Sequence, residues 1–209
     1  MKNYICLHYK DAMPLVQEGD VLLFRGQRFW SLFIRQITQS PYSHAGLASW
    51  HNGDKSILEI IEFHLTTGGV SRNLEHVVEK SPGIIDVYRP SPRKYDLEYY
   101  PDTGVLIQCY DYDGKAVTST MRRLTALPYS LFKIGLMARG KAFGLRLLNN
   151  VRAISDDTLQ KSANHVCSTS IAYSMNANGY DLVKNKSDLK TEPGELAKST
   201  LLNYLFTFK

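Results

Sequence analysis

A cysteine and a histidine stand far apart in this sequence, and each has a local setting suited to nucleophilic catalysis. His44 lies in the strand-like segment SHAGL, and Cys167 lies in HVCSTS, at the expected start of a helix. Unpaired N–H groups at a helix N-terminus favour a thiolate and can stabilise an oxyanion. The pair predicts a Cys167 nucleophile with His44 as general base and acid. The small residues Ala45 and Gly46 are expected to leave room for a substrate.

A catalytic imidazole needs a partner that fixes its tautomer and its orientation. The strand of His44 and the following segment SILEIIE form a predicted hairpin around the turn HNGD. With this four-residue turn, Glu59 is expected near the cross-strand position from His44, and Glu62 on the other face. A register slip would reverse the choice. We therefore expect Glu59 to orient His44, with Glu62 as the alternative.

Each of these residues also has a simpler interpretation when it is taken alone. A free cysteine is usually a small buried residue, a histidine is usually a satisfied core or surface group, and a glutamate is usually a solvated charge. Cys6 and Cys109 keep the simpler interpretation, because neither lies in a comparable segment. The functional hypothesis therefore depends on Cys167, His44 and a glutamate acting together.

Length and composition predict one globular domain over residues 1–209, with 44% hydrophobic and 22% charged residues. The net charge of +5 is dispersed, and no nucleic-acid motif accompanies it, so no nucleic-acid partner is expected. Three cysteines without CxxC spacing argue against disulfides and against a zinc site, and no cofactor is expected. The chain shows no signal peptide and no apolar span, which predicts a cytoplasmic protein.

The hydrophobic pattern predicts an α+β protein in which an antiparallel sheet packs against helices. Residues 91–113 are expected to form a loop, with Gly104–Tyr110 as an extra strand or an insertion, and residues 131–148 remain ambiguous. The expected strands are Val21–Phe24, His44–Trp50, Ile57–Phe63 and Gly83–Pro90, and the expected helices are Phe29–Thr38, Asn73–Glu79, Lys115–Leu127 and Ser168–Asn178.

Five segments resemble a known group of enzymes, the permuted papain-like (permuted NlpC-type) cysteine hydrolases of the YiiX/YaeF group, which are similar to lecithin retinol acyltransferase. These segments are EGDVLLFRG, PYSHAGL, SILEIIE, HVCSTSIAY and TEPGELAKS. The resemblance implies a circularly permuted papain-like fold, because the histidine precedes the cysteine. It also implies a Cys167, His44 and Glu59 triad, with Tyr42 and Ser168 at the substrate, and it suggests a bacterial or phage origin.

The function implied by this resemblance is cleavage of an amide bond, for example in a cell-wall peptide, through a thioester intermediate. A cell-wall target would require a delivery route, since no export signal is visible. The first alternative is a lipid-directed thioesterase, phospholipase or acyltransferase with peripheral membrane contact, based on Lys133, Arg139, Lys141 and Arg146. The second is a non-catalytic binding module. The substrate class (small molecule, peptide or lipid) and the oligomeric state stay open.

Overall fold

A large mixed sheet forms the centre of the computed structural model, which describes residues 5–27, 29–51, 55–64, 68–100, 104–125, 167–184 and 186–208. Its strands are β1 (Cys6–Leu7), β2 (Val21–Arg25), β3 (His44–Trp50), β4 (Leu58–His64), β5 (Gly68–Asn73), β6 (Ile84–Pro90) and β9 (Leu202–Phe208). They lie in the order β1-β9-β6-β2-β3-β4-β5. All neighbours are antiparallel except β1 and β9, which are parallel.

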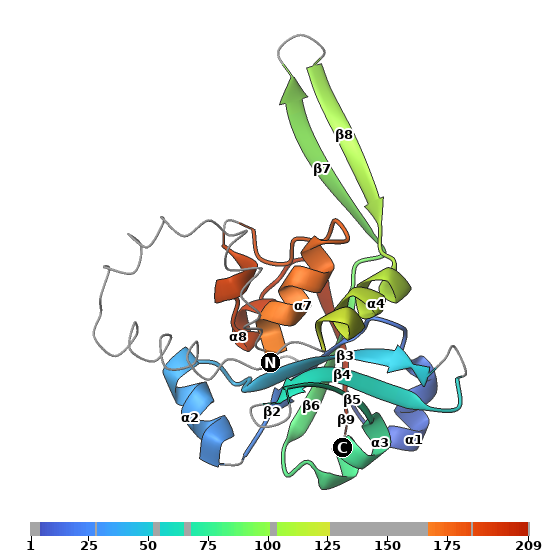
Figure 1. The fold of residues 1–209 in the computed structure, drawn as a ribbon, viewed down its shortest axis with the longest axis vertical. Helices are drawn as coiled ribbons and strands as arrows, with labels where there is room; N and C mark the ends of the chain where they lie inside the picture. The colour runs from blue at the N-terminus through green and yellow to red at the C-terminus, as the bar shows by residue number, and fades with distance from the viewer. Residues whose placement is uncertain are drawn as a thin grey trace.

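Helices cover both faces of this sheet, as Figure 1 shows. The helices of the described residues are α1 (Tyr9–Ala12), α2 (Phe29–Thr38), α3 (Leu74–Lys80), α4 (Gly114–Leu124), α7 (Cys167–Asn176) and α8 (Pro193–Leu196), with short 3-10 turns at Met13–Leu15 and Asp188–Lys190. One core lies under α4, α7 and α8 and includes Leu47, Ile61, Met121, Ile171 and Leu196. A second core lies under α1 and α3 and includes Ala12, Leu22, Ala48, Ile60 and Leu74. The sheet is therefore buried on both sides.

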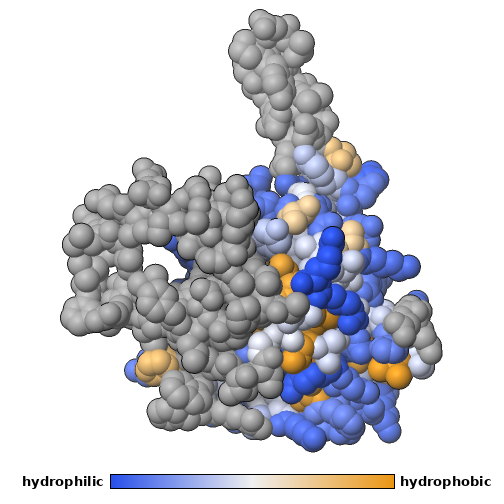
Figure 2. All heavy atoms as spheres, in the orientation of Figure 1, coloured by the Kyte–Doolittle hydropathy of each residue, from blue (hydrophilic) through white to orange (hydrophobic). Residues whose placement is uncertain are grey.

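The surface formed by the described residues is mainly polar on the face that Figure 2 draws. Hydrophobic residues show only in small groups on that face. The exposed large hydrophobic residues are scattered along the chain, at Ile5, Leu15, Leu32, Phe33, Ile57 and Ile84. Scattered exposed apolar residues are normal in a folded protein and carry no functional meaning by themselves.

Local capping explains where several helices begin and end. The Asn73 side chain accepts a hydrogen bond from the N–H of Glu75 at the start of α3, and Asp113 accepts bonds from two N–H groups at the start of α4. After α7 the chain reaches Gly179 with φ +84°, a conformation that glycine adopts without strain and that ends a helix. Gly179 thus marks the end of the helix whose first residue is Cys167.

Residues 91–113 differ from the expected loop. Strands β7 (Arg93–Tyr100) and β8 (Gly104–Asp111) form a two-stranded antiparallel ribbon that projects from the body in Figure 1. The predicted strand at Gly104–Tyr110 is confirmed, and the loop prediction for its partner is wrong. The prolines at positions 92 and 101 flank β7 and do not interrupt it, which is why a continuous strand fits between them.

The other predicted strands and helices are found among the described residues. The strands near Val21, His44 and Gly83 and the hairpin partner after Ile57 are confirmed, as are the helices near Phe29, Asn73, Lys115 and Ser168. The sequence did not predict β1, β5, β9, α1 or α8, and β9 lies between β1 and β6 in the sheet. The ambiguous residues 131–148, including the four basic residues of the lipid hypothesis, lie outside the described residues.

Candidate active site

Cys167 is the first residue of α7, where it meets the start of β3. Its side chain is buried at 5% exposure, and it shares a hydrogen bond with His44. The backbone N–H groups of Ala45 and Ser168 also donate to the sulfur. Burial alone would raise the pKa of the Cys167 thiol, but the charge and hydrogen bond of His44 and these two donors outweigh it and lower the pKa. The surroundings therefore favour a thiolate.

His44 is the first residue of β3, and its ring connects the thiol to a carboxylate. Nε2 lies 2.6 Å from Oε2 of Glu62, and the ring also shares a hydrogen bond with the Cys167 thiol. The ring of Phe24 packs against the imidazole with centroids 5.1 Å apart. Burial opposes a charge on this imidazole, but the Cys167 thiolate and the Glu62 carboxylate together raise the pKa of His44 to about 10. The imidazolium form is thus favoured at neutral pH.

Glu62 is fully buried in β4 and is surrounded by cationic or protonatable groups. Its Oε2 faces His44, and its Oε1 accepts from Arg72 Nε at 2.8 Å and lies 3.0 Å from His64 Nε2. Burial raises the pKa of this carboxyl group, but the hydrogen bonds and charges of His44 and His64 dominate and hold the pKa well below its usual range. Glu62 is therefore a buried carboxylate that can fix the His44 ring.

The expectation that Glu59 lies beside His44 is wrong in position. Strand β3 pairs with β4 so that Gly46 faces Glu62 and Ser49 faces Glu59. Trp50 pairs with Leu58, so residues 51–57 separate the strands, where a four-residue turn was expected. Three additional residues are an odd number, and an odd shift exchanges the two faces of the second strand. The alternative, Glu62, occupies the position that the sequence argument gave to Glu59.

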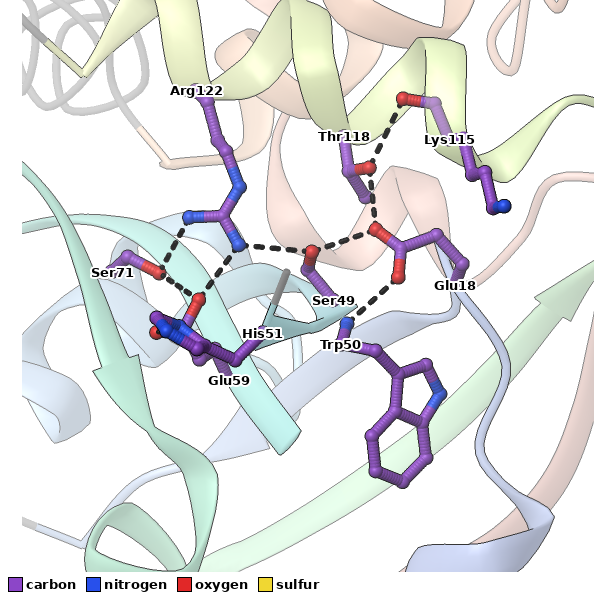
Figure 3. Close-up of polar contacts among 9 residues, drawn as sticks. All are labelled: Glu18, Ser49, Trp50, His51, Glu59, Ser71, Lys115, Thr118 and Arg122. Atoms are coloured by element: carbon purple, nitrogen blue, oxygen red, sulfur yellow. Dashed lines mark hydrogen bonds and ion pairs between the residues drawn. The ribbon is translucent and has the colours of Figure 1, made fainter. Parts of the chain in front are cut away.

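Glu59 belongs instead to a polar cluster that ties α4 to the sheet (Figure 3). Its Oε2 accepts from Arg122 Nη2 at 2.7 Å and from the Ser71 hydroxyl at 3.0 Å, and its Oε1 lies 2.9 Å from His51 Nδ1. Arg122 also donates to Ser49. The cluster continues through Ser49 to Glu18, Thr118 and the backbone N–H of Trp50. These contacts hold two layers together and leave no direct link from Glu59 to His44.

Tyr42 and Ser168, expected at the substrate, have buried side chains. The Tyr42 hydroxyl donates to Asp86 at 2.7 Å and lies 2.8 Å from the Tyr88 hydroxyl. The Ser168 hydroxyl donates to the Thr191 carbonyl oxygen at 2.7 Å. Burial with engaged hydroxyls does not fit a substrate contact through these side chains. Ser168 contributes to the site through its backbone N–H.

The sequence suggested that Gly46 leaves room for a substrate, and the structure contradicts this. A Cβ atom at this position would lie 2.5 Å from Cδ1 and 2.6 Å from Cγ1 of Ile60, closer than real contacts allow. The space beside Gly46 is thus already filled by the neighbouring strand. The glycine lets Ile60 pack next to the buried Glu62.

Gly46→Ala should therefore destabilise the protein by about 1–3 kcal/mol, because the added methyl group forces Ile60 to move. Urea unfolding followed by circular dichroism measures this. Ile60→Val removes the nearest atom, so the double variant should lose less than the sum of the two single changes. A Gly46→Ala protein as stable as the parent would contradict the packing argument.

Three residues of the candidate site were not recognised from the sequence or were ranked second: Glu62, His64 and Arg72. His64 follows Glu62 by two positions, and its ring centroid lies 5.4 Å from that of His44. Arg72 comes from β5, a strand that the sequence reading did not anticipate. The alternation of Glu62 and His64 along one strand face is the signal that could have found them.

His44, Glu62 and His64 also raise the question of a metal. One ligand atom from each lies within 4.8 Å of the other two, and imidazole and carboxylate groups are common zinc ligands. Nη2 of Arg72, however, lies 2.9 Å from His64 Nε2 and donates to Glu62 Oε1. A guanidinium group thus stands where a metal bound to both residues would lie. The side chains as arranged do not fit a metal.

Comparisons with known proteins support the fold. No family model matches the sequence, and no curated protein matches it. The crystal structure of the metalloprotein YiiX from Escherichia coli O157:H7 matches with a TM-score of 0.54 and 16% identity, over 90% of this chain and 96% of that chain. The chain therefore has a YiiX-like α+β fold. Among the described residues, no helix has the length and apolar character to cross a membrane.

Proposed function

We propose that this protein is a cysteine hydrolase in which Cys167, His44 and Glu62 act as nucleophile, general acid/base and orienting carboxylate. The observation that carries the proposal is the continuous contact from the Cys167 sulfur through the His44 ring to the buried Glu62 carboxylate, 2.6 Å from Nε2. The order of these residues, histidine before cysteine, agrees with a permuted papain-like arrangement. The YiiX-like fold is compatible with it.

The mechanism follows from the charge states. The Cys167 thiolate attacks a carbonyl carbon and forms a C–S bond, while N–H groups at the start of α7 stabilise the oxyanion. The His44 imidazolium gives its proton to the leaving amine or alcohol as the C–N or C–O bond breaks. Neutral His44 then takes a proton from water, which attacks the thioester and releases the acid. Glu62 keeps the imidazole in place and stabilises its positive charge in both steps.

An amide in a peptide is the substrate class that we favour, and a cell-wall peptide is one example. A lipid ester or thioester would react by the same first half, but the basic residues behind that alternative lie outside the described part of the chain. A binding module without turnover is the remaining alternative. It has no need of a thiol whose pKa is lowered beside an imidazolium, which favours catalysis.

Trapping the acyl-enzyme tests the proposal. Cys6 and Cys109 are exposed and would react with any electrophile, so the parent for this experiment carries Cys6→Ser and Cys109→Ser. Mixing with p-nitrophenyl acetate should give a burst of p-nitrophenolate and one acetyl group on Cys167, located by mass spectrometry of acid-quenched peptides. Cys167→Ser in the same background is the matched control and should show no burst. An equal burst in that control, or acetyl groups on lysines alone, would contradict the proposal.

A further inference from the structure

Arg72 makes contact with the candidate triad from the neighbouring strand. In the register of β4 and β5 it lies opposite Ile60, and its side chain is 46% exposed. Its Nε and Nη2 both donate to Oε1 of Glu62, and Nη2 lies 2.9 Å from His64 Nε2. The guanidinium thus contacts Glu62 at the oxygen that does not face His44.

His64 can use Nε2 in only one way at a time. That atom lies 2.9 Å from Arg72 Nη2 and 3.0 Å from Glu62 Oε1. When Nε2 carries no proton, its lone pair accepts from Arg72, and when it is protonated it donates to Glu62. A metal ion would use the same lone pair. Arg72 and a metal therefore compete for the same two atoms, His64 Nε2 and Glu62 Oε1.

Geometry and charge both favour the guanidinium in this competition. Zinc binds imidazole nitrogen and carboxylate oxygen at about 2.0–2.2 Å, so an ion shared by Glu62 and His64 would overlap the position of Nη2. Arg72 is also permanently charged, so a divalent ion nearby would be repelled. Because the guanidinium is a planar fork, two of its donors meet one carboxylate oxygen in a fixed orientation.

We propose that Arg72 is the resident cation of the His44, Glu62 and His64 cluster, where it closes the cluster to divalent transition metals and positions Glu62 for His44. In this role the positive charge of Arg72 balances the negative charge of Glu62, as a bound metal ion would. The exclusion of metal stands on the geometry and charge of the cluster and does not depend on the proposed function. The positioning role rests on the proposed function, and the two roles have separate readouts.

Zinc titration by calorimetry tests the exclusion of metal. All proteins are untagged and carry Cys6→Ser, Cys109→Ser and Cys167→Ser, so that no thiol binds zinc. Arg72→Ala should bind one Zn²⁺ about tenfold or more tighter than the parent, and adding His64→Ala should remove this gain. Arg93→Ala is the matched control, because Arg93 also pairs with a carboxylate, Asp111, and its loss changes the net charge equally. The Arg93→Ala protein should bind Zn²⁺ no more tightly than the parent.

Two outcomes would overturn the exclusion of metal. One is a parent that already binds Zn²⁺ as tightly as Arg72→Ala and loses it with His64→Ala, since a metal would then displace Arg72. The other is an Arg72→Ala protein that is folded by circular dichroism and gains no affinity. Should Arg72→Ala fail to fold, Arg72→Met keeps the aliphatic length of the side chain without its charge and is titrated in its place.

Acetylation of Cys167 tests the positioning role. With Cys167 restored, Arg72→Ala should slow the burst with p-nitrophenyl acetate about tenfold or more, and millimolar guanidinium should restore part of the rate. Rescue by the free ion separates positioning of Glu62 from a general loss of stability, which guanidinium would worsen. Slowed acetylation with no rescue would overturn this role. A parent without any burst would contradict the proposed function and leave the zinc result intact.

Discussion

Glu62→Gln should lower kcat/KM by about 10⁴-fold, the size of the loss in kcat when the carboxylate behind a catalytic histidine is replaced by its amide. Glutamine keeps the shape of the side chain but cannot stabilise the imidazolium, and it can present an N–H group to His44 Nε2 where an acceptor is needed. The hydrogen bond of 2.6 Å to a fully buried oxygen is the contact that is lost. Initial rates of ester or peptide hydrolysis measure the effect.

Glu59→Gln is the matched control for this prediction. Glu59 lies three positions before Glu62 in the same strand and also carries an arginine and a histidine partner, but it does not contact His44. Its neutralisation should change kcat/KM by less than about twofold and should cost about 1 kcal/mol or less of stability, since Arg122 is partly solvated. If Glu59→Gln lost as much activity as Glu62→Gln, the register-based assignment of the triad would be wrong.

His44→Ala should remove the general acid and base together and lower kcat/KM by about 10²–10⁴-fold. It should also raise the pKa of Cys167, because the largest favourable contribution to the thiolate is the charge of His44. In the parent, activity should rise with pH as the Cys167 thiol loses its proton, at a pH below the usual pKa of a thiol. It should fall near pH 10, where His44 loses the proton that the leaving group needs. In the variant the rising limb should move to higher pH, and the falling limb should be absent because the group that produces it is gone.

Much of the site could be predicted because its parts are local. The helix that begins at Cys167 follows from apolar spacing and the stop at Gly179, and the strand at His44 follows from the hairpin pattern. Neither residue needs distant information to be placed on its element. Their contact depends on the packing of α7 against β3, which no local sequence pattern specifies.

The carboxylate partner of His44 could not be predicted. It depends on whether the number of residues that connect β3 and β4 is even or odd. A change from four connecting residues to seven exchanges Glu59 for Glu62, and no local propensity decides between these lengths. Arg72 was missed for another reason. Its strand reads GGVSRN, a polar edge strand with two glycines, which lacks the hydrophobic alternation by which strands are recognised.

The rate of alkylation of Cys167 as a function of pH tests the central claim most directly. In the background without Cys6 and Cys109, iodoacetamide should modify Cys167 through a thiolate that persists below the usual thiol pKa of about 8.5. In His44→Ala the rate at pH 6 should fall by roughly two orders of magnitude, as expected for an ordinary thiol at that pH. A parent that titrates near 8.5, with the same profile as His44→Ala, would contradict the account.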